Sequence, residues 1–500
     1  MVTSASATTG TLSSGASADR VTALQRAGAW IAATLLVMLI ARLLAGALFG
    51  PTDAGSAHPH VLIIVADDLG WGDVGYHGGS VQTPQIDALA AASVQLERFY
   101  TAPICTAARV GLMTGRAPEL LGAVYGVIRP DDDFGLPADA TTLGELFQNA
   151  GYETAMIGKW HLGHRERRFE PRQRGFEHSY GTLLGGVDYY SHRGRSRRAD
   201  LPAERVQWHR NGIALAERGY ATQLIADEAR RIIANRDPHR PLFLYVPFTA
   251  PHVPLQAPVE LVQRYGEAFT DDARRKHAAM VDAMDRAIGA VIAELAKRGL
   301  YEDTLILFLS DNGANPAHGS NGPLRAGKST AFEGGVRVPA LLKLPRGDLG
   351  GQRFAGFVRT TDVWPTLAAI VGDESDRVER LEGVDLLPWI RGTAEAPAER
   401  DFYFFGPFGE TRAEMTFGLL RGDWKLLVRA DWRSCALRTR LFSILDDPGE
   451  LHDHSAARPQ LVAELRAALL NRAALHPEHG LGDTAAVGRC LARLSRLAPS

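Results

Sequence analysis

The sequence is poor in several features that define other classes of protein. It has three cysteines, at positions 105, 435 and 490, which excludes a disulfide-rich scaffold and a zinc site built from four thiolates. It has no excess of positive charge, since 55 basic residues face 57 acidic ones, and this disfavours general nucleic-acid binding. Heptads and internal repeats are also absent. With 45% hydrophobic and 22% charged residues, the 500-residue chain has the composition of a large folded globular protein.

Long apolar runs are rare as well, and only one segment near the N-terminus approaches the length of a membrane span. Residues 29–49 are apolar apart from one threonine and Arg42, and Arg20 and Arg26 precede them. A cleaved signal peptide and an uncleaved anchor both fit this pattern, whereas a buried core helix rarely follows a polar tail. Either form leaves the N-terminus in the cytoplasm and exports the rest. We therefore expect a tail over 1–57 and a periplasmic or other extracytoplasmic body, secreted or membrane-anchored.

Beyond residue 57, short buried runs alternate with helical patterns. Continuous apolar runs predict four strands, at His60–Ala66, Thr154–Ile157, Pro241–Val246 and Thr304–Leu309. Apolar residues at helical spacing, ending at a glycine, predict helices over Thr141–Ala150 and Lys276–Arg298. This alternation predicts an α/β fold with a large, mostly parallel sheet flanked by helices.

The character of the sequence changes near residue 395. A linker-like run, TAEAPAERD, precedes the aromatic strand-like runs FYFFG and WKLLV, a turn at DDPGE and a helical segment over Pro459–Ala474. These features predict a small C-terminal α+β domain with an antiparallel sheet and a closing helix. We expect a main domain over 58–395, this smaller domain over 396–480, and a tail over 481–500.

Polar residues follow all four predicted strands of the main domain. They are Asp67 and Asp68, Lys159 and His161, His252, and Asp311 and Asn312. Because ligands bind outside the carboxyl ends of strands in open α/β sheets, these residues predict one common site. Three carboxylates and an amide oxygen select Ca²⁺ or Mg²⁺ over zinc. Cations beside such a metal suit an anionic substrate, sulfate or phosphate above all.

A lone cysteine precedes an arginine by four residues in Pro103–Arg109 (PICTAAR), which is followed by VGLMTGR. This segment resembles the first signature of the sulfatase family, C-x-[P/A]-x-R, with the Ala variant at position 107 where Pro is more usual. The run GYETAMIGKWHLG (Gly151–Gly163) matches the second signature throughout. Similar runs extend over roughly residues 58 to 475. The chain thus resembles the formylglycine-dependent type I sulfatases of the alkaline phosphatase superfamily. Through LLGGVDYYSH it is most similar to the arylsulfatase B, or N-acetylgalactosamine-4-sulfatase, group.

The resemblance implies a sulfuric ester hydrolase whose nucleophile is made from Cys105. In the family, a formylglycine-generating enzyme oxidises this cysteine to 3-oxoalanine, called formylglycine, and the hydrate of the aldehyde carries two geminal hydroxyls. One hydroxyl, activated by the metal, attacks sulfur, and the other later expels sulfate. The implied metal ligands are Asp67, Asp68, Asp311, Asn312 and the modified Cys105.

The resemblance also assigns roles to the cations and histidines of the site. Arg109 would hold the formylglycine hydrate, and Lys159 and Lys328 would neutralise sulfate oxygens. His252 would protonate the leaving alcohol, and His161 would assist the release of sulfate.

Other functions stay open at this stage. Phosphodiesterases and phosphonate monoester hydrolases of the same superfamily also use formylglycine. An inactive, envelope-anchored glycan-binding protein could use the same scaffold, although no loss among the site residues is visible. A phosphatase of the alkaline type would use serine or threonine and two zinc ions, and Cys105 argues against it.

Positive charge is concentrated between His164 and Arg210, where 11 arginines stand against six acidic residues in a chain whose net charge is −2. Since this stretch follows the second signature, we expect it to overhang the site and to attract a polyanion. Tyr189, Tyr190 and Trp208 would offer flat faces to sugars. These features predict a sulfated saccharide as substrate, with a 4-sulfated hexosamine by analogy with the arylsulfatase B group. The alternative is a solvated loop whose arginines pair with carboxylates.

The two remaining cysteines form an even pair once Cys105 is oxidised. Cys435 and Cys490 are separated by 55 residues in a body that we expect to be exported, a setting that permits disulfides. A disulfide between them and two unrelated thiols are both compatible with the sequence.

Overall fold

The computed structural model describes most of the chain beyond the N-terminal tail. The described residues are 58–130, 132–194, 208–373, 381–395, 397, 400–408, 414–431, 433–476 and 488–490. The chain divides into two compact units between Gly55 and Ser56, and all described residues lie in the second. The predicted export segment, 29–49, and most of the predicted tail over 481–500 lie outside the described residues. Within the described ranges, no helix is long and apolar enough to cross a membrane.

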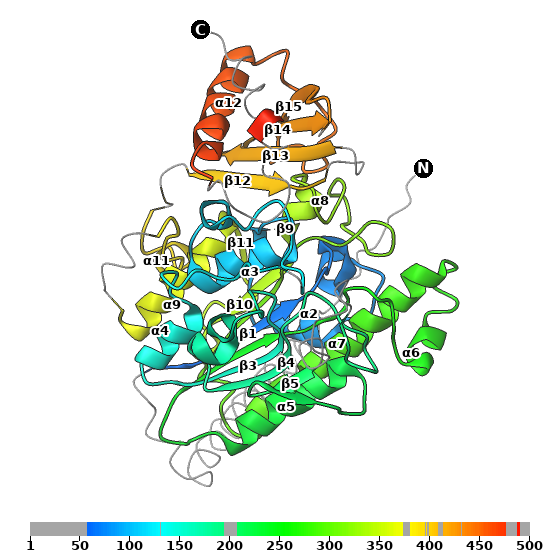
Figure 1. Cartoon of the computed structure of the whole chain (residues 1–500), viewed down its shortest axis with the longest axis vertical. Coiled ribbons are helices and arrows are strands. Elements are labelled where there is room, and N and C mark those ends of the chain that lie inside the picture. The colour runs from blue at the N-terminus through cyan, green and yellow to red at the C-terminus, as the bar shows by residue number, and fades with distance from the viewer. Residues whose placement is uncertain are drawn as a thin grey trace, which may run out of the picture. The chain divides into compact units, whose positions relative to one another are not determined.

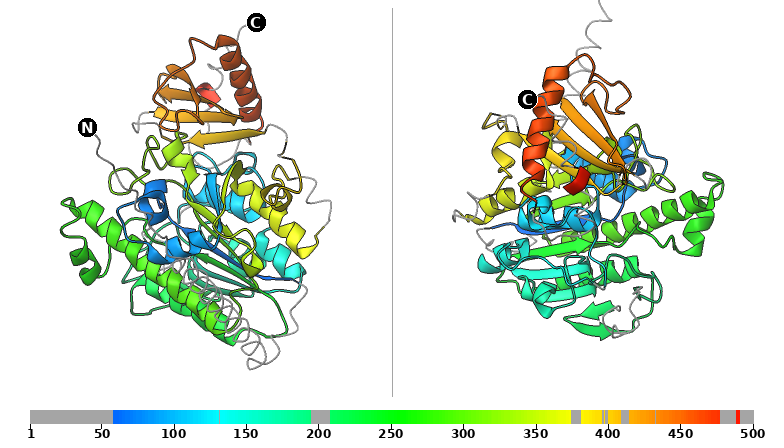
Figure 2. Two further views of the ribbon diagram at one scale, coloured as in Figure 1. Left: turned by 180° about the vertical axis from the view of Figure 1, so that it is seen from behind. Right: turned by 45° about the horizontal axis from the view of Figure 1, so that its top comes forward.

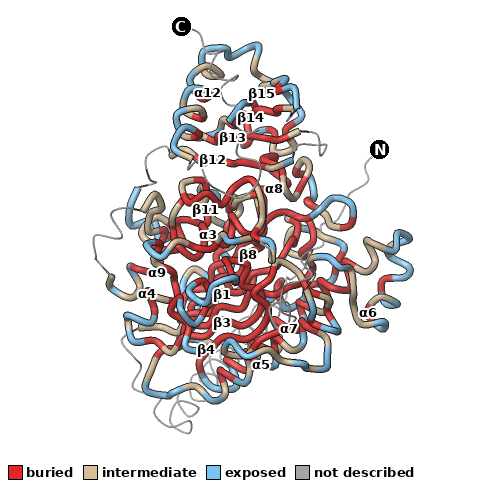
Figure 3. Tube along the Cα trace, in the orientation of Figure 1, coloured by how far each residue is buried: buried red, intermediate tan, exposed pale blue. Residues whose placement is uncertain are grey.

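A large mixed sheet forms the centre of the main domain (Figure 1). Its central strands are parallel and lie in the order β8 (Thr304–Ser310), β1 (His60–Ala66), β7 (Leu242–Pro247), β3 (Glu153–Lys159) and β4 (His178–Thr182). All four predicted strands are among them. Every residue of β7 and β8 is buried, which explains why these strands are apolar throughout rather than alternating (Figure 3).

Further strands, in both antiparallel and parallel pairings, complete the sheet on both sides of this parallel centre. They include β10 (Ala340–Lys343), which pairs with β8 and β2, and β5 (Trp208–Arg210), which pairs with β4. The other strands of the two flanks are β2 (Val94–Tyr100), β9 (Arg337–Val338), β11 (Arg353–Arg359) and β6 (Ile213–Leu215). The predicted α/β architecture is confirmed, with antiparallel strands added at both flanks.

Helices cover both faces of the main sheet (Figures 1 and 2). Successive residues of β1 point to different faces, so that Val61 and Ile63 join one hydrophobic core and Leu62 and Ile64 join the other. The first core is closed by α3 (Cys105–Thr114), α4 (Leu143–Asn149), α9 (Val363–Val371) and α11 (Leu387–Ile390). The second is closed by α2 (Pro84–Ala91), α5 (Ala221–Asn235), α6 (Val259–Arg264) and α7 (Asp272–Lys297). The predicted helices correspond to α4 and α7.

A separate sheet of four antiparallel strands follows the main domain along the chain. Its strands, in order, are β12 (Asp401–Gly406), β13 (Glu414–Arg421), β14 (Trp424–Asp431) and β15 (Leu437–Ser443). Helix α12 (Pro459–Ala473) packs against this sheet through Leu465 and Leu469. The predicted antiparallel sheet with a closing helix is confirmed.

A buried ion cluster joins this second sheet to the main domain. Lys425 of β14 places its Nζ atom 2.9 Å from Glu333 Oε1, in α8 (Glu333–Val336), and 3.1 Å from Glu450 Oε1. All three side chains are fully buried. Removing one member of a buried ion cluster leaves an uncompensated charge, so this contact strongly favours one placement of the second sheet.

The structure confirms a disulfide between Cys435 and Cys490, which lie in the core of the second sheet. The bridge spans a sequence separation of 55 residues. In the chain-entropy model, a loop of this length contributes about 4 kcal/mol by restricting the unfolded chain. Replacing both cysteines with serine is expected to lower the free energy of unfolding by about that amount, measured by urea denaturation. An unchanged urea midpoint would contradict this role.

Candidate active site

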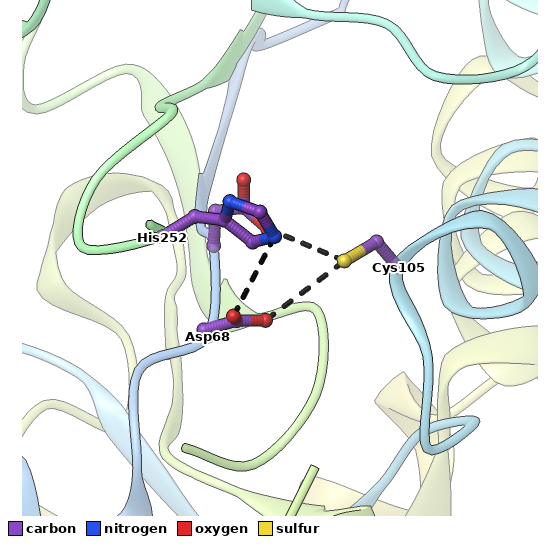
Figure 4. Close-up of side chains that lie close together, drawn as sticks. Asp68, Cys105 and His252 are labelled. Carbon is purple, nitrogen blue, oxygen red and sulfur yellow. Dashed lines mark hydrogen bonds and ion pairs between the residues drawn. The ribbon is translucent and has the colours of Figure 1, made fainter. Parts of the chain in front are cut away.

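Side chains from four neighbouring parallel strands meet at one edge of the main sheet. They are Asp67 and Asp68 after β1, Lys159 at the end of β3, His252 after β7, and Asp311 and Asn312 after β8. Cys105 is the first residue of α3, and it reaches the same place. Figure 4 shows Asp68, Cys105 and His252 pointing toward one another from three separate segments. The structure therefore brings the predicted strand-end residues and the predicted nucleophile together.

Two adjacent buried carboxylates, Asp67 and Asp68, lie at the centre of the site. Lys159 donates from Nζ to Asp67 Oδ2 at 2.6 Å, and Lys328 donates from Nζ to Asp68 Oδ2 at 2.7 Å. The Oδ1 atoms of the same aspartates lie 3.5 Å and 3.8 Å from Cys105 Sγ. Each carboxylate thus presents one oxygen to a lysine and the other to the cysteine.

A third buried carboxylate, Asp311, is held by Arg109. Two guanidinium nitrogens, Nε and Nη2, donate to Asp311 Oδ2 at 3.0 and 2.8 Å, and Nη1 donates to the carbonyl oxygen of Lys159 at 2.8 Å. Burial alone would lower the pKa of Arg109, but Asp311 and Asp67 raise it above its ordinary value. In this structure Arg109 therefore orients Asp311 and β3. None of these three hydrogen bonds involves Cys105.

Burial and neighbouring charges push the pKa values of the three carboxyl groups apart. Burial raises the pKa of Asp67 well above its ordinary range, although Lys159 opposes the effect. Burial also acts to raise the pKa of Asp68, but Lys328 and His252 outweigh it and lower that pKa. The pKa of Asp311 is lowered because Arg109 and Lys159 outweigh its burial. Of the three carboxyl groups, Asp67 is thus the one whose ionised form an additional cation nearby would stabilise most.

The oxygen atoms of the site fit a hard divalent cation. Asp67, Asp68, Cys105 and His252 offer possible ligand atoms that lie within 4.8 Å of one another. Asn312 donates from Nδ2 to Asp68 Oδ1 at 2.7 Å, while its buried Oδ1 has no hydrogen-bond partner among the described residues. A buried amide oxygen without a donor is unfavourable unless it has a ligand, and oxygen ligands suit Ca²⁺ and Mg²⁺.

His161 is buried beside this cluster in a form that can accept a proton. Its Nε2 lies 3.0 Å from the carbonyl oxygen of Ile128, which can only accept, so Nε2 carries the ring proton. Its Nδ1 is buried and has no partner within the described ranges. Burial, together with Lys159 and Arg109, lowers the pKa of His161 well below its ordinary value. The ring is therefore neutral, with a free lone pair on Nδ1.

His252 presents its other nitrogen to the site. Its Nδ1 lies 2.7 Å from the carbonyl oxygen of Val253 and so carries a proton, whereas Nε2 lies 3.7 Å from Asp68 Oδ2. Burial and Lys328 lower the pKa of His252. A bound anion would oppose both effects and favour protonation of Nε2.

Two site residues have a left-handed backbone although neither is glycine. The φ angles of Asp68 and His161 are 68° and 60°. Such conformations cost of order 1–3 kcal/mol each and persist where neighbouring contacts hold them. Here the Asp68 N–H donates to Asp311 Oδ1 at 3.1 Å, and the His161 N–H donates to Leu183 O at 3.2 Å.

A cavity of about 400 Å³ borders this cluster. Its lining includes Cys105, His161, His252 and Lys328. The rest of its wall comes from Ile104, Ser329 and three segments, 125–130, 184–186 and 407–408. The volume lies within the range of pockets that bind small ligands.

The predicted sugar-binding aromatic residues are placed differently from the expectation. Tyr189 and Trp208 are 1% and 0% exposed and lie in the core between the sheet and its helices, so the prediction was wrong for both. Tyr190 is 47% exposed. The aromatic residues that line the cavity are Tyr125 and Phe408, which the sequence reasoning missed. No local pattern marks them, because folding brings their distant segments to one cavity.

Four of the seven described arginines of the basic stretch pair with carboxylates. Arg165 pairs with Asp133, Arg168 with Glu166, Arg174 with Glu145, and Arg210 with Glu217 and Glu228. Four other arginines of the stretch, Arg195, Arg197, Arg198 and Arg205, lie within residues 195–207, outside the described residues. These four arginines follow the alternative of a paired, arginine-rich segment.

A cysteine and carboxylate and amide oxygens lie beside three buried or half-buried cations at the carboxyl edge of an α/β sheet, and these are the groups that a hydrolase of anionic esters requires. The family model named Sulfatase matches residues 59–372, more than half of the chain. The chain is 35% identical to arylsulfatase J of Mus musculus over 408 residues, which are 79% of this chain and 66% of that protein. It is 32% identical to arylsulfatase A of Homo sapiens, with 73% of this chain and 74% of that protein covered.

Solved structures agree with these sequence matches. The crystal structure of Ps i-CgsB in complex with k-i-k-neocarrahexaose has a TM-score of 0.77 at 29% identity, covering 88% of this chain and 98% of that one. The phosphonate monoester hydrolase of Agrobacterium radiobacter shares the fold alone, with a TM-score of 0.57 at 21% identity. The chain belongs to the sulfatase family and is a sulfuric ester hydrolase. Since the relatives are an arylsulfatase J and an arylsulfatase A, they do not single out the arylsulfatase B group.

Proposed function

We propose that this sulfatase hydrolyses sulfate monoesters of saccharides through a formylglycine made from Cys105. The observation that carries the proposal is the position of Cys105, whose Sγ faces the Oδ1 atoms of both Asp67 and Asp68 at 3.5 and 3.8 Å. Lys328 lines the same cavity as Cys105. A nucleophile at residue 105 would thus meet sulfur where carboxylates and cations converge.

The metal ligands would be the residues that the family resemblance names. They are Asp67, Asp68, Asp311, Asn312 and the modified residue 105, and they suit calcium first and magnesium second. When bound, the ion would polarise a sulfate oxygen and make a hydroxyl nucleophilic at neutral pH.

The first chemical step transfers the sulfuryl group to residue 105. One hydroxyl of its hydrate would lose its proton to water and form a bond to sulfur, the ester S–O bond would break, and the alcohol would leave with a proton. Lys159 and Lys328 would neutralise the sulfate oxygens. The proton would come from Nε2 of His252, the ring nitrogen that faces the site, after the anionic substrate has favoured its protonation.

The second step releases sulfate and restores the aldehyde. The remaining hydroxyl of residue 105 loses its proton, its C–O bond becomes a double bond, and the C–O bond to sulfate breaks. His161 would accept this proton at Nδ1, which is buried and without a partner among the described residues. Water then hydrates the aldehyde again. An unmodified cysteine or a serine has no second hydroxyl and could not release sulfate in this way.

Two glycines that touch the histidines provide a test of the His161 assignment. A Cβ at Gly185 would lie 2.5 Å from His161 Nε2, whereas a Cβ at Gly186 would lie 3.4 Å from His252 Nδ1. We expect Gly185→Ala to displace the His161 ring and lower kcat for a small aryl sulfate roughly 10- to 100-fold. The matched variant Gly186→Ala should have a much smaller effect, since its contact is close to ordinary distances. Equal kcat values for the two variants would contradict this role for His161.

The saccharide part of the proposal rests on the cavity and on a structural relative. Ps i-CgsB was crystallised with a neocarrahexaose. In the present chain, the cavity above Cys105 adds the exposed ring of Phe408 to the charged cluster. Small aryl sulfates would then be surrogate substrates.

We further propose that the protein is exported by residues 29–49, either as a cleaved signal or as a retained anchor. Its maturation would require a formylglycine-generating enzyme as partner. We also propose that the catalytic domain covers residues 58–395 and that the smaller C-terminal domain covers residues 396–480.

The proposed activity can be tested with purified protein co-expressed with a formylglycine-generating enzyme. We expect hydrolysis of a small aryl sulfate, and no more than slow hydrolysis of the matching aryl phosphonate. A preference for the phosphonate would instead support the phosphonate monoester hydrolase alternative. Hydrolysis of neither substrate, with residue 105 oxidised, would support the glycan-binding alternative.

A further inference from the structure

The described part of the cavity wall includes an exposed cation that the sulfate-binding cluster does not use. Arg129 lines the cavity together with Cys105 and is exposed. Lys159 and Lys328 each hold a carboxylate oxygen within 2.7 Å. By contrast, among the described residues no carboxylate forms an ion pair with the Arg129 guanidinium.

The backbone around Arg129 is fixed against the catalytic residues. The Ile128 N–H donates to Thr106 Oγ1 at 3.1 Å, and the Ile128 carbonyl oxygen lies 3.0 Å from His161 Nε2. The Arg129 N–H donates to Asp132 Oδ2 at 2.7 Å. Thr106 directly follows the nucleophile, so Ile128 is held against the catalytic cluster. Arg129 is the next residue along the chain, and adjacent Cα atoms are about 3.8 Å apart.

An aromatic ring is fixed on another part of the same wall. The Phe408 N–H donates to the carbonyl oxygen of Ser329 at 3.0 Å, and Ser329 directly follows Lys328. The Phe408 carbonyl oxygen accepts from Thr416 Oγ1 at 2.9 Å, which ties it to β13. Phe408 is 39% exposed and lines the cavity. The second sheet thus supplies an apolar surface beside a sulfate-binding lysine.

We propose that Arg129 and Phe408 select a saccharide that carries a second anionic group close to the sulfate that is cleaved. A guanidinium binds a sulfate or carboxylate through paired hydrogen bonds, and an aromatic face packs against the apolar face of a sugar ring. A substrate with a single anionic group would leave Arg129 without a partner. This inference rests on the proposed function and adds the class of substrate.

The test compares disaccharides that share the scissile sulfate. One has no other anionic group, one has a second sulfate, and one has a uronate carboxylate. We expect the wild-type protein to prefer one or both dianionic compounds. In Arg129→Gln, the ratio of kcat/KM for the preferred dianionic compound to that for the monoanionic one should fall 10- to 100-fold, mainly through KM. Arg129→Lys should restore part of the ratio, because it keeps the charge but loses the paired geometry.

A matched charge-removing control is available at the opposite edge of the sheet. Arg346 is exposed and pairs with Asp303, which directly precedes β8 at its amino end. Arg346→Gln should leave the ratio unchanged. Equal melting temperatures and equal oxidation of residue 105 would show that the variants fold and mature alike.

The outcomes separate this inference from the proposed function. A wild-type protein without preference for either dianionic compound would overturn the inference, as would an unchanged ratio in Arg129→Gln or an equal fall in Arg346→Gln. In each of these cases sulfate hydrolysis itself would stand. A wild-type protein with oxidised residue 105 that hydrolyses none of the sulfate esters would overturn the proposed function and the inference with it. The compound that the wild-type protein prefers identifies the second group as a sulfate or a carboxylate.

Discussion

Replacing Cys105 with serine or alanine is expected to lower the steady-state hydrolysis of a small aryl sulfate by roughly 10⁴-fold or more. Neither residue can be oxidised to formylglycine by an enzyme that recognises the cysteine, so the geminal hydroxyls cannot form. The measurement is kcat on protein co-expressed with the formylglycine-generating enzyme, with melting temperatures recorded for both variants because residue 105 is buried.

The serine variant gives the sharper of the two results. A serine hydroxyl could attack sulfur once, but it has no second hydroxyl to expel sulfate. Cys105→Ser should therefore release at most one equivalent of the aryl alcohol and then stop, and Cys105→Ala should release none. Sustained turnover by either variant would contradict the mechanism.

The second large effect is expected at Lys328, which faces the cavity. Its side chain is 19% exposed, and its Nζ lies 2.7 Å from Asp68 Oδ2. Replacing it with alanine removes a positive charge from the position where sulfate oxygens would bind. We expect kcat/KM for a small aryl sulfate to fall roughly 100- to 1,000-fold, and inhibition by free sulfate to weaken in parallel.

Lys276 provides a matched control for this variant. It lies on the surface of α7 and pairs with Asp272 at 2.6 Å. Because exposed ion pairs contribute little, Lys276→Ala should retain wild-type kcat/KM and sulfate inhibition. A Lys328→Ala variant within threefold of the wild-type value would show that this lysine does not bind the sulfate group.

The parts of the fold that could be predicted have local signals in the sequence. Strands β1, β7 and β8 are buried on both faces, and this leaves continuous apolar runs. Helix α4 is capped by Thr142, whose side chain accepts from the Glu145 N–H while the Glu145 carboxylate accepts from the Thr142 N–H. Parallel strands present their carboxyl ends at one edge, so the polar residues after them could be placed together before their contacts were known.

The rest depends on tertiary packing, which a local pattern does not encode. Tyr189 and Trp208 look like surface aromatics beside arginines, yet they fill the core beside α5. Arg129 and Phe408 come from distant segments, and only the placement of the second sheet brings them to one cavity. The spacing of Cys105 and Arg109 in the sequence likewise did not reveal that the guanidinium is directed at Asp311.

The most direct test of the central claim follows residue 105 and the activity in the same preparations. Protein expressed with graded amounts of a formylglycine-generating enzyme would be digested with trypsin, and the peptide Phe99–Arg109 would be analysed by mass spectrometry. The fraction of residue 105 present as formylglycine would then be compared with kcat for a small aryl sulfate. We predict that kcat rises in proportion to this fraction and extrapolates to zero when all of residue 105 is cysteine. Full activity in protein that contains only unmodified Cys105 would contradict the account.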